Sequence, residues 1–349
     1  MASAASILET ILSRAWLRRG LLAYALWPLS RLFGGLLALR RVLYRYGWLA
    51  SMRLPVPVII VGNVFVGGTG KTPLTIWLVE ALRRAGRAPG VISRGYGALE
   101  NPGATPCLVL PDATPQQVGD EPLLIARRAQ CPVVVGRDRV AAAQVLLAEH
   151  PELDCIVCDD GLQHYRLARD VEIVLFDGRG AGNGWLLPAG PLREPAARRR
   201  DFTVVNLVDG ADLPAGMPTD AYRMVLAGAV AQRLCDPAQQ LPLHELAGLP
   251  GKIVAAAGIG NPARFFATLR QAGLIFEDMP LPDHYDFAVN PFGNSAADII
   301  LITEKDAVKC ALVTELKNDP RLWVVPVTAY LDGALAQRIL EKCRGQSIT

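Results

Sequence analysis

The amino-acid sequence predicts an α/β protein in three parts: a doubly wound parallel-sheet domain, a second and smaller α/β domain, and an N-terminal membrane-associated helix. From Pro55 onward, short β-branched runs alternate with helical stretches, the pattern of a parallel sheet covered by helices on both faces. A second alternating set begins near Gly251, and the N-terminal segment has a different composition from both sets. We expect divisions at residues 1–50, 51–220, a connector at 221–250, and 251–349.

Composition indicates a globular chain in a reducing compartment. Its 349 residues are 51% apolar and 20% charged, which suffices for two packed cores and argues against disorder. The seven cysteines follow no regular spacing, as is typical of reduced proteins. Cys155 and Cys158 form a C-x-x-C pair, but without a second pair a buried strand is favoured over a metal or redox site.

The N-terminal segment combines apolar residues, arginines and aromatic rings. Residues 1–55 hold eight arginines and one acidic residue, Glu9, so they carry more positive charge than the net +3 of the whole chain. Residues 21–39 are about as long as a membrane span, although Pro28, Ser30 and Arg31 interrupt the run. Packing on the domain is one interpretation. A helix lying in the membrane interface is favoured over it and over a span, because aromatic rings suit the headgroup level: Trp16, Trp27, Tyr44, Tyr46 and Trp48.

The expected elements follow from the apolar runs. In the larger domain we expect strands at residues 56–61, 91–93, 133–135, 155–158, 173–176 and 202–206, and helices at 72–85, 122–129 and 139–148. In the smaller domain we expect strands at 252–257, 299–303 and 323–327, and helices at 262–272 and 332–343. Residues 222–234 are interpreted as a connector. The basic run 198–200 is interpreted as a solvated face, too short for a nucleic-acid site.

A glycine-rich loop follows the first strand and opens the first helix. Successive backbone N–H groups of such a P-loop point into one concavity, where the helix N-terminus adds positive potential. Phe65 stands where the usual spacing has glycine, so the loop is a variant. Binding of ATP with Mg²⁺ is favoured over a purely structural loop, with Lys71 on the β- and γ-phosphates and the Thr72 hydroxyl on the metal. The loop residues are Gly67, Gly68, Thr69, Gly70, Lys71 and Thr72.

Two acidic pairs add to this interpretation. Asp159 and Asp160 follow a buried strand, where a P-loop domain holds its Mg²⁺. Asp120 and Glu121 precede a helix, and helix capping alone would explain them. A carboxylate fixed there could also accept the proton of a sugar hydroxyl. His284 lies in a polar loop of the smaller domain, although a lone histidine is more often structural.

Together these strings resemble one family, the tetraacyldisaccharide 4′-kinases. The resemblance runs in order from about residue 55 to 310, and the variant loop spacing is also typical of that family. In the larger domain it rests on residues 62–73, 93–97, 118–122, 159–164, 182–184 and 187–195. In the smaller domain it rests on residues 257–262, the Asp283-His284 loop and 303–309.

The resemblance implies a kinase that moves the γ-phosphate of ATP to the 4′-hydroxyl of an acylated glucosamine disaccharide 1-phosphate, giving lipid IVA for lipopolysaccharide. It implies that Asp120 is the catalytic base and that His284 supports it. We expect the pair to act as one unit across the two domains, and nearby phosphate charge to raise the proton affinity of the carboxylate. The remaining implied site residues are Lys71 and Arg193 on phosphate charge, and Thr72, Glu121, Asp159 and Asp160 on Mg²⁺.

An acylated substrate would also explain the N-terminal segment, because acyl chains stay in the membrane. We therefore expect the chain at the cytoplasmic face of the bacterial inner membrane, peripheral or with a single N-terminal anchor, with no nucleic acid and no obligate protein partner. The alternative is a membrane-attached ATPase or nucleotide switch acting on a protein partner. A soluble kinase of a free small molecule would leave the N-terminal arginines and aromatic residues unexplained.

Overall fold

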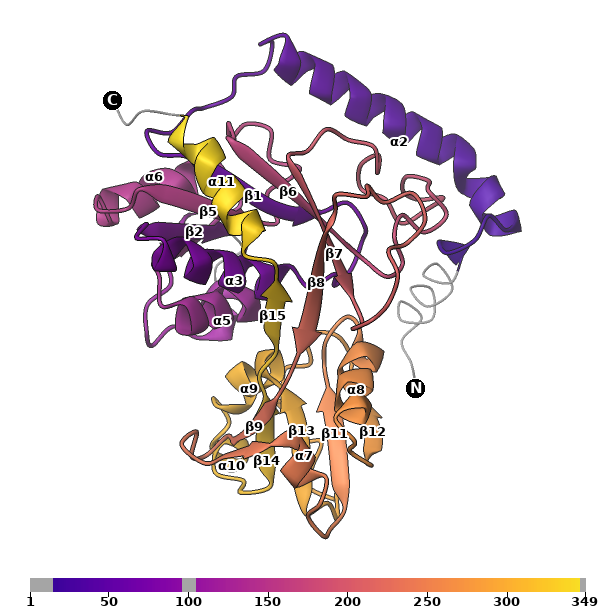
Figure 1. Ribbon diagram of the computed structural model, residues 1–349, viewed down its shortest axis with the longest axis vertical. Helices are drawn as coiled ribbons and strands as arrows, with labels where there is room; N and C mark the ends of the chain where they lie inside the picture. The colour runs from indigo at the N-terminus through magenta and orange to yellow at the C-terminus, as the bar shows by residue number, and fades with distance from the viewer. Residues whose placement is uncertain (1–14, 96–104, 346–349) are drawn as a thin grey trace.

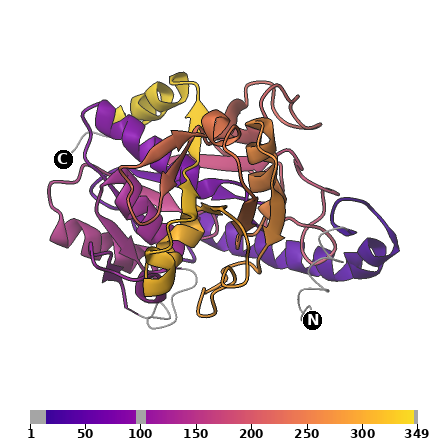
Figure 2. The same ribbon diagram turned by 90° about the horizontal axis from the view of Figure 1, so that it is seen from below.

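The computed structural model describes residues 15–95 and 105–345. The chain forms two sheets with their helices and one long N-terminal helix, α2 (Leu21–Arg45) (Figure 1). The two sheets lie at opposite ends of the molecule, and α2 runs beside the larger one and projects beyond it (Figures 1 and 2). Residues 1–14 of the N-terminal segment, and Tyr96 and Gly97 of one resembling string, lie outside the described residues.

The larger sheet confirms the predicted doubly wound α/β class. Its strand order is β15-β8-β7-β6-β1-β5-β2-β4-β3, so the chain leaves central β1 toward one edge and later returns to build the other. Neighbouring strands are parallel except at the two edges, where β15 and β3 run antiparallel to theirs. The strands are β1 (Val58–Asn63), β2 (Pro89–Ser93), β3 (Cys107–Leu108), β4 (Val133–Val135), β5 (Cys155–Asp159), β6 (Val171–Asp177), β7 (Phe202–Leu207), β8 (Tyr222–Ala227) and β15 (Thr328–Leu331).

Helices cover both faces of this sheet, which explains why β1 is an unbroken apolar run. Ile59 and Val61 pack with α3 (Lys71–Arg84), α5 (Asp120–Ala129) and α11 (Ala334–Arg344), while Val58 and Ile60 pack on the opposite face with α6 (Arg139–Glu149). Successive side chains of a strand point to opposite faces, so a strand covered on both sides must be apolar throughout. A short helix, α4 (Pro115–Val118), precedes α5.

The smaller sheet has the order β10-β9-β14-β13-β11-β12. Its strands are β9 (Val230–Arg233), β10 (Gln240–Pro242), β11 (Ile253–Ala257), β12 (Glu277–Pro280), β13 (Ile299–Thr303) and β14 (Leu322–Val325). Its helices are α7 (Leu243–Leu246), α8 (Pro262–Gln271), α9 (Glu304–Cys310) and α10 (Thr314–Lys317). Leu269 of α8 packs on one face of the sheet and Cys310 of α9 on the other.

The two sheets divide the chain differently from the predicted boundaries. The expected connector is not a separate segment, because β8 extends the larger sheet beside β7 while β9 and β10 belong to the smaller one. The C-terminal region is not part of the smaller domain either. β15 pairs with β8, and α11 buries Leu335 and Ile339 in the core that contains α3. The pairing of β15 with β8 and the packing of α11 place the end of the chain on the larger domain. The chain therefore crosses between the domains twice, after β8 and after β14.

Helix α2 has one side on the protein and another exposed. It continues through Pro28, and Ser30 donates from Oγ to the Leu186 carbonyl at 2.8 Å. Trp27 lies against Trp185, with ring centroids 6.5 Å apart. The described chain contains this one helix long and apolar enough to cross a membrane. Part of the helix therefore packs on the domain, the alternative left open by the sequence.

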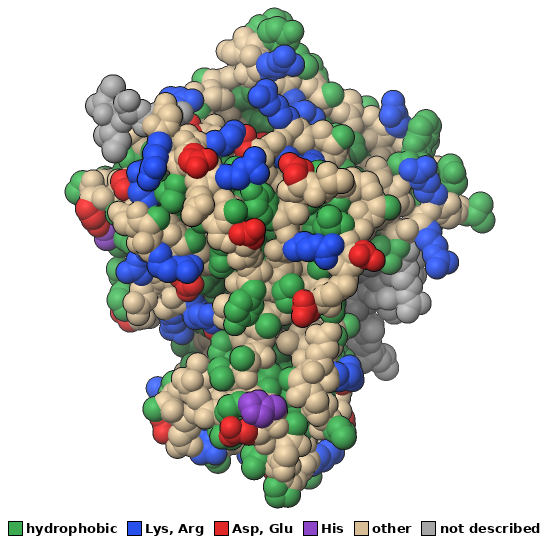
Figure 3. All heavy atoms as spheres, viewed as in Figure 1, with side chains coloured by type: hydrophobic (Ala, Val, Ile, Leu, Met, Phe, Trp, Pro, Cys, Tyr) green, Lys and Arg blue, Asp and Glu red, His purple; other side chains and the backbone are tan. Residues whose placement is uncertain are grey.

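The outer side of α2 is apolar. Leucines spaced three and four residues apart are 55–63% exposed there: Leu29, Leu32, Leu36 and Leu39. Arg31, Arg40 and Arg45 are exposed on the same helix. In the space-filling view, hydrophobic and basic side chains alternate along the upper right outline, where this helix lies (Figure 3). Such a side suits the boundary between lipid headgroups and acyl chains.

Candidate active site

The glycine-rich loop lies between the end of β1 and the start of α3, as predicted. Gly70 precedes the helix at φ 98°, a left-handed conformation that favours glycine. A side chain there would also collide, because a Cβ on Gly70 would lie 2.5 Å from Nδ2 of Asn206. The N-terminus of α3 therefore opens directly from the loop, the arrangement that binds phosphate.

Two asparagines to which sequence analysis gave no role hold this loop. Asn63, the last residue of β1, donates from Nδ2 to the Phe65 carbonyl at 2.7 Å and to the Thr69 hydroxyl at 3.0 Å. Asn206 of β7 donates to the Thr69 carbonyl at 2.7 Å. Phe65 accounts for the variant spacing, because its side chain is buried against Arg179, whose Cζ lies 4.1 Å from the ring centroid. Phe65 thus makes a buried packing contact at the position where the usual loop has a glycine.

Asp159 ends β5, the strand beside β1, and is buried. Its Oδ1 accepts a bond from the Thr75 hydroxyl and its Oδ2 one from the Ser93 hydroxyl, each at 3.2 Å. Burial and the negative charge of Glu121 raise the pKa of Asp159 to about 6. The two carboxylates are therefore close enough to repel each other.

Asp160 differs from its neighbour because cations surround it. Arg193 donates to Asp160 Oδ1 at 3.0 Å from Nη2 and to Oδ2 at 3.2 Å from Nη1. Nζ of Lys71 lies 3.8 Å from Oδ1. Burial raises the pKa of Asp160, but the charges of Lys71 and Arg193 outweigh it and lower the pKa to about 2. The structure thus brings together three residues predicted from separate strings.

Asp120 begins α5, two residues before the predicted helix start. Its Oδ1 accepts the N–H of Glu121 at 2.9 Å, but the N-cap residue of the helix is Gly119, which has no side chain to accept a capping bond. Its Oδ2 faces the smaller domain, 3.1 Å from Nδ1 of His284 and 3.8 Å from Nζ of Lys309. The capping interpretation of Asp120 is therefore wrong, and the contacts of Oδ2 favour the cross-domain interpretation.

The protein groups around Asp120 lower its proton affinity, whereas the expected increase concerned the charge of bound phosphate. Burial raises its pKa, but the hydrogen bond to His284 and the charges of Lys305, His284 and Lys309 lower it to about 2. The hydrogen bond to Asp120 in turn raises the pKa of His284. Glu121 forms an ion pair with Lys305, and although burial opposes it, that charge lowers the pKa of Glu121. Cations of the smaller domain therefore keep both carboxylates ionised.

A cavity lies between the domains at this point. Gly260 of the smaller domain closely approaches the loop, since a Cβ there would lie 3.8 Å from the backbone N of Gly68. Arg264 of α8 donates a hydrogen bond to Oδ1 of Asn206, which holds the loop. Lys305 and Arg264 had no predicted role, although Lys305 belongs to a resembling string. Both domains line the cavity. The larger domain contributes Gly68, Thr69, Gly70, Lys71, Thr72, Pro73, Ile76, Glu121, Leu124 and Leu226. The smaller domain contributes Ile259, Gly260, Asn261, Arg264, Phe265, Thr268, Thr303, Glu304 and Lys305, and Val327 comes from the segment that leads back to the larger sheet.

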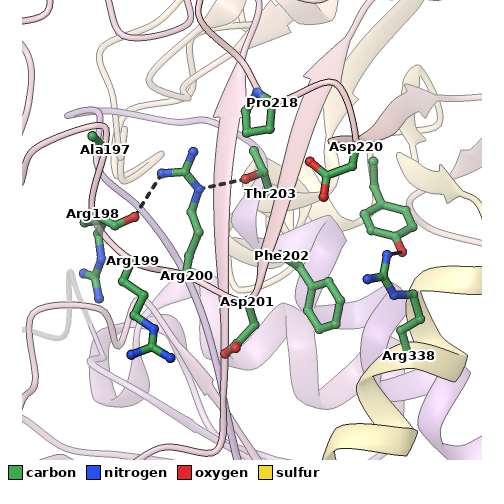
Figure 4. Close-up of a pocket in the computed structure, with 11 residues that line it drawn as sticks. Ala197, Arg198, Arg199, Arg200, Asp201, Phe202, Thr203, Pro218, Asp220 and Arg338 are labelled. Atoms are coloured by element: carbon green, nitrogen blue, oxygen red, sulfur yellow. Dashed lines mark hydrogen bonds between the residues drawn. The ribbon is translucent and has the colours of Figure 1, made fainter.

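The basic run 198–200 is only in part the solvated face that the sequence suggested, because Arg199 is exposed whereas Arg198 is buried. Arg198 is 6% exposed and forms ion pairs with Glu172 at 2.7 Å and Glu194 at 2.8 Å. Figure 4 shows Arg200 directed to Thr203, whose hydroxyl accepts its Nε at 2.7 Å, on the wall of a hollow at the far end of the larger sheet. Arg198 is therefore a structural residue, and the sequence spacing does not reveal its carboxylate partners.

The C-x-x-C cysteines lie within β5 and are buried, as the strand interpretation expected. Burial raises the pKa of the Cys158 thiol to about 11 and also raises that of Cys155. Within residues 15–95 and 105–345, no group of three or more His, Cys, Asp and Glu side chains has the arrangement of a metal site. The two thiols are therefore packing residues.

Comparisons with known proteins agree with these features. The chain matches the family described as tetraacyldisaccharide-1-P 4′-kinase over residues 22–344. It is 65% identical to the tetraacyldisaccharide 4′-kinase of Janthinobacterium sp. (strain Marseille) over 100% of both chains. It is 61% identical to the protein of the same name from Herminiimonas arsenicoxydans over 98% of each.

Among solved structures, the fold is similar to the crystal structure of the "apo" form of LpxK from Aquifex aeolicus in complex with ATP. The TM-score is 0.74 and the identity 28%, covering 92% of this chain and 99% of that one. The family match covers both sheets, the loop that lines the cavity, and the Asp120–His284 contact beside it. The resemblance inferred from the motifs is therefore confirmed, and the chain belongs to the tetraacyldisaccharide-1-P 4′-kinase family.

Proposed function

We propose that the chain transfers the γ-phosphate of ATP to the 4′-hydroxyl of a tetraacylated glucosamine disaccharide 1-phosphate, giving lipid IVA. The observation that carries this proposal is the 3.1 Å contact between Asp120 Oδ2 and His284 Nδ1. It joins the two domains beside a cavity that contains the phosphate-binding loop. The names of the relatives, which are tetraacyldisaccharide 4′-kinases, support the acceptor.

The loop residues Gly67 to Thr72 would bind the β- and γ-phosphates through their backbone N–H groups. Lys71 and Arg193 carry positive charge on the same side of the loop, held there by Asp160. Phosphoryl transfer spreads negative charge over the moving group, so fixed cations stabilise its transition state more than its ground state. We therefore assign Asp160 to orienting these two cations.

The donor set suits Mg²⁺, which takes hard oxygen ligands and keeps waters and phosphate oxygens among them. Thr72, Asp159 and Glu121 would hold it, and a bound divalent cation would offset the effects of burial and of the Glu121 charge, which raise the pKa of Asp159. When bound, Mg²⁺ would neutralise phosphate charge. Asp160 is a weaker candidate ligand because Arg193 already engages both of its oxygens.

Asp120 and His284 would receive the proton of the 4′-hydroxyl. A carboxylate of low pKa is a weak base in the ground state, but in a loose transition state the hydroxyl becomes strongly acidic only as the bond to phosphorus forms. The carboxylate then needs correct orientation more than high basicity, and its contact with His284 provides that. Because His284 comes from the other domain, the site is complete only when the domains are together, which would limit loss of ATP to water.

We also propose that the outer side of α2 rests in the cytoplasmic face of the bacterial inner membrane, where the acyl chains of the substrate lie. Replacing Leu32 and Leu36 with glutamate should reduce co-sedimentation with anionic vesicles, as should removal of residues 1–50, while ATP binding persists. Glutamate at Thr314 and Leu312, which are exposed on the smaller domain, is the matched control. Equal sedimentation of all the variants would contradict the membrane role.

Mass spectrometry of lipids tests the reaction itself. Purified protein is incubated with ATP, Mg²⁺ and tetraacyldisaccharide 1-phosphate, and the product should gain one phosphate, whereas Asp120→Ala should give little. ATP hydrolysis without a phosphorylated lipid, stimulated by a protein fraction, would instead support the nucleotide-switch alternative. Fragmentation that locates the new phosphate on a position other than 4′ would contradict the proposed acceptor site.

A further inference from the structure

Lys309 presents a buried charge to the site from behind the cavity wall. It belongs to α9, is 6% exposed, and does not line the cavity. Its Nζ lies 3.8 Å from Asp120 Oδ2 and 3.9 Å from Asp306 Oδ1. Within the described part of the chain the ammonium group forms ion pairs but no hydrogen bond. A buried ammonium is costly unless opposite charge compensates it, and here one of its two carboxylates belongs to the other domain.

Asp306 links Lys309 to the second partner of Asp120. This carboxylate is fully buried and accepts bonds at Oδ2 from the Thr303 hydroxyl at 2.7 Å and from the Gly258 N–H at 3.1 Å. The Gly258 carbonyl in turn accepts the N–H of His284 at 3.1 Å. One carboxylate of the smaller domain therefore fixes both the helix that carries Lys309 and the turn that carries His284.

The path to Asp120 has little freedom. A Cβ at Gly258 would lie 2.9 Å from Asp306 Oδ1, so the turn passes directly over the carboxylate. Nζ of Lys309 also lies 5.9 Å from the ring centroid of buried Phe287, within cation–π range. Neither partner can move far without breaking these contacts. The ammonium and the imidazole thus approach the same oxygen of Asp120 from one rigid unit.

We propose that Lys309 is a positioning residue for Asp120, and that Asp306 holds Lys309 and His284 in fixed positions relative to each other. This inference rests on the proposed role of the Asp120–His284 pair. Lys309 acts through the carboxylate and not on the substrate. Two attractions converge on Oδ2 and, together with the bond that Oδ1 accepts from the Glu121 N–H, fix the carboxylate plane. Because both groups belong to the smaller domain, the carboxylate takes this orientation only when the domains meet.

The test compares Lys309→Met, which keeps the shape but removes the charge, with Lys309→Arg, which keeps the charge. Lys309→Met should lower kcat by about 10- to 100-fold, with the KM for ATP and lipid changed less than about 3-fold, as expected when an interaction acts in the transition state. Lys309→Arg should recover part of the loss. Lys317→Met, on the exposed side of α10, is the matched control and should keep normal turnover.

A double-mutant cycle with His284→Ala completes the test. Because both residues act on one oxygen, Lys309→Met should cost much less in the His284→Ala background than alone. Losses that multiply, or a kcat of Lys309→Met within about 3-fold of wild type, would overturn the inference. If Lys309→Met does not fold, Lys309→Gln serves the same comparison. Normal turnover of Asp120→Ala would show instead that the proposed base is wrong, whereas an inactive Asp120→Ala with an active Lys309→Met would refute this inference alone.

Discussion

The phosphate side and the hydroxyl side of the site are held by different kinds of contact. On the phosphate side, the contacts that fix Asn63, Asp160 and Arg193 all lie within the larger domain. On the hydroxyl side, the contacts of Asp120 and Glu121 cross to the smaller domain. The phosphate side should therefore keep its form whether or not the domains meet, while the hydroxyl side exists only when they do. Damage to the first should impair phosphate handling, and damage to the second should impair turnover while ATP still binds.

The largest effect should come from Lys71→Ala. This change removes a cation from the phosphate side, where charge develops as phosphate moves, and turnover should fall by about 10²- to 10³-fold. Steady-state assays of the phosphorylated lipid measure it, with thermal unfolding to verify that the fold persists. Lys252→Ala, an exposed lysine of the smaller domain, is the control. Near-normal turnover of the Lys71 variant would remove this residue from the phosphate site.

On the hydroxyl side, Asp120→Ala and His284→Ala should each lower turnover by about 10²-fold. The double variant should be little worse than the poorer single one, because either change dismantles the same pair. Equilibrium binding of ATP should change little in all three variants, since neither Asp120 nor His284 is among the residues that line the loop cavity. Losses that multiply in the double variant would show two independent roles and break the proposed unit.

The same contrast explains what the sequence could predict. The glycine loop and Asp159 were placed correctly because each follows its own strand directly, and parallel strands bring their carboxyl ends to one edge. The buried runs β1, β5 and β7 were recognisable for the same local reason. Short sequence motifs therefore predict most of the phosphate side. The main residues that they did not identify are the two asparagines that hold the loop, Asn63 and Asn206.

The hydroxyl side required information that no local pattern holds. The low pKa of Asp120 arises from the hydrogen bond to His284 and from the charges of Lys305 and Lys309, and all three residues are distant from it in sequence. The return of β15 to the larger sheet was missed because edge pairing with β8 depends on where the chain crosses. The family resemblance supplied the Asp120–His284 pairing, which the spacing of the two residues does not predict.

A smaller effect should follow from weakening a contact between the domains that does not involve Asp120 or His284. Arg128 of α5 donates from Nη1 to Glu304 Oε1 at 2.5 Å, and Glu304 Oε2 accepts the N–H of Val327 at the second crossing. Arg128→Met should lower kcat/KM by about 3- to 10-fold, as expected for a partly exposed ion pair. Arg127→Met, exposed on the same helix, is the matched control. An effect equal to that of His284→Ala would mean that domain contact, and not the pair itself, limits turnover.

The smallest effect should be a pH dependence of stability. The bond to Asp120 raises the pKa of His284 above its ordinary value of about 6.5. A group that binds its proton more tightly when folded stabilises the fold fully below its unfolded pKa, and the gain is lost as pH rises through the folded pKa. Asp283 adds to this attraction and Lys305 opposes it. The free energy of unfolding in urea, measured between pH 6 and 9, should therefore exceed that of His284→Ala most at the acid end. The difference should shrink as pH rises. A difference that stayed constant or grew would show that the histidine contacts Asp120 in its neutral form, leaving orientation as its sole contribution to the hydroxyl side.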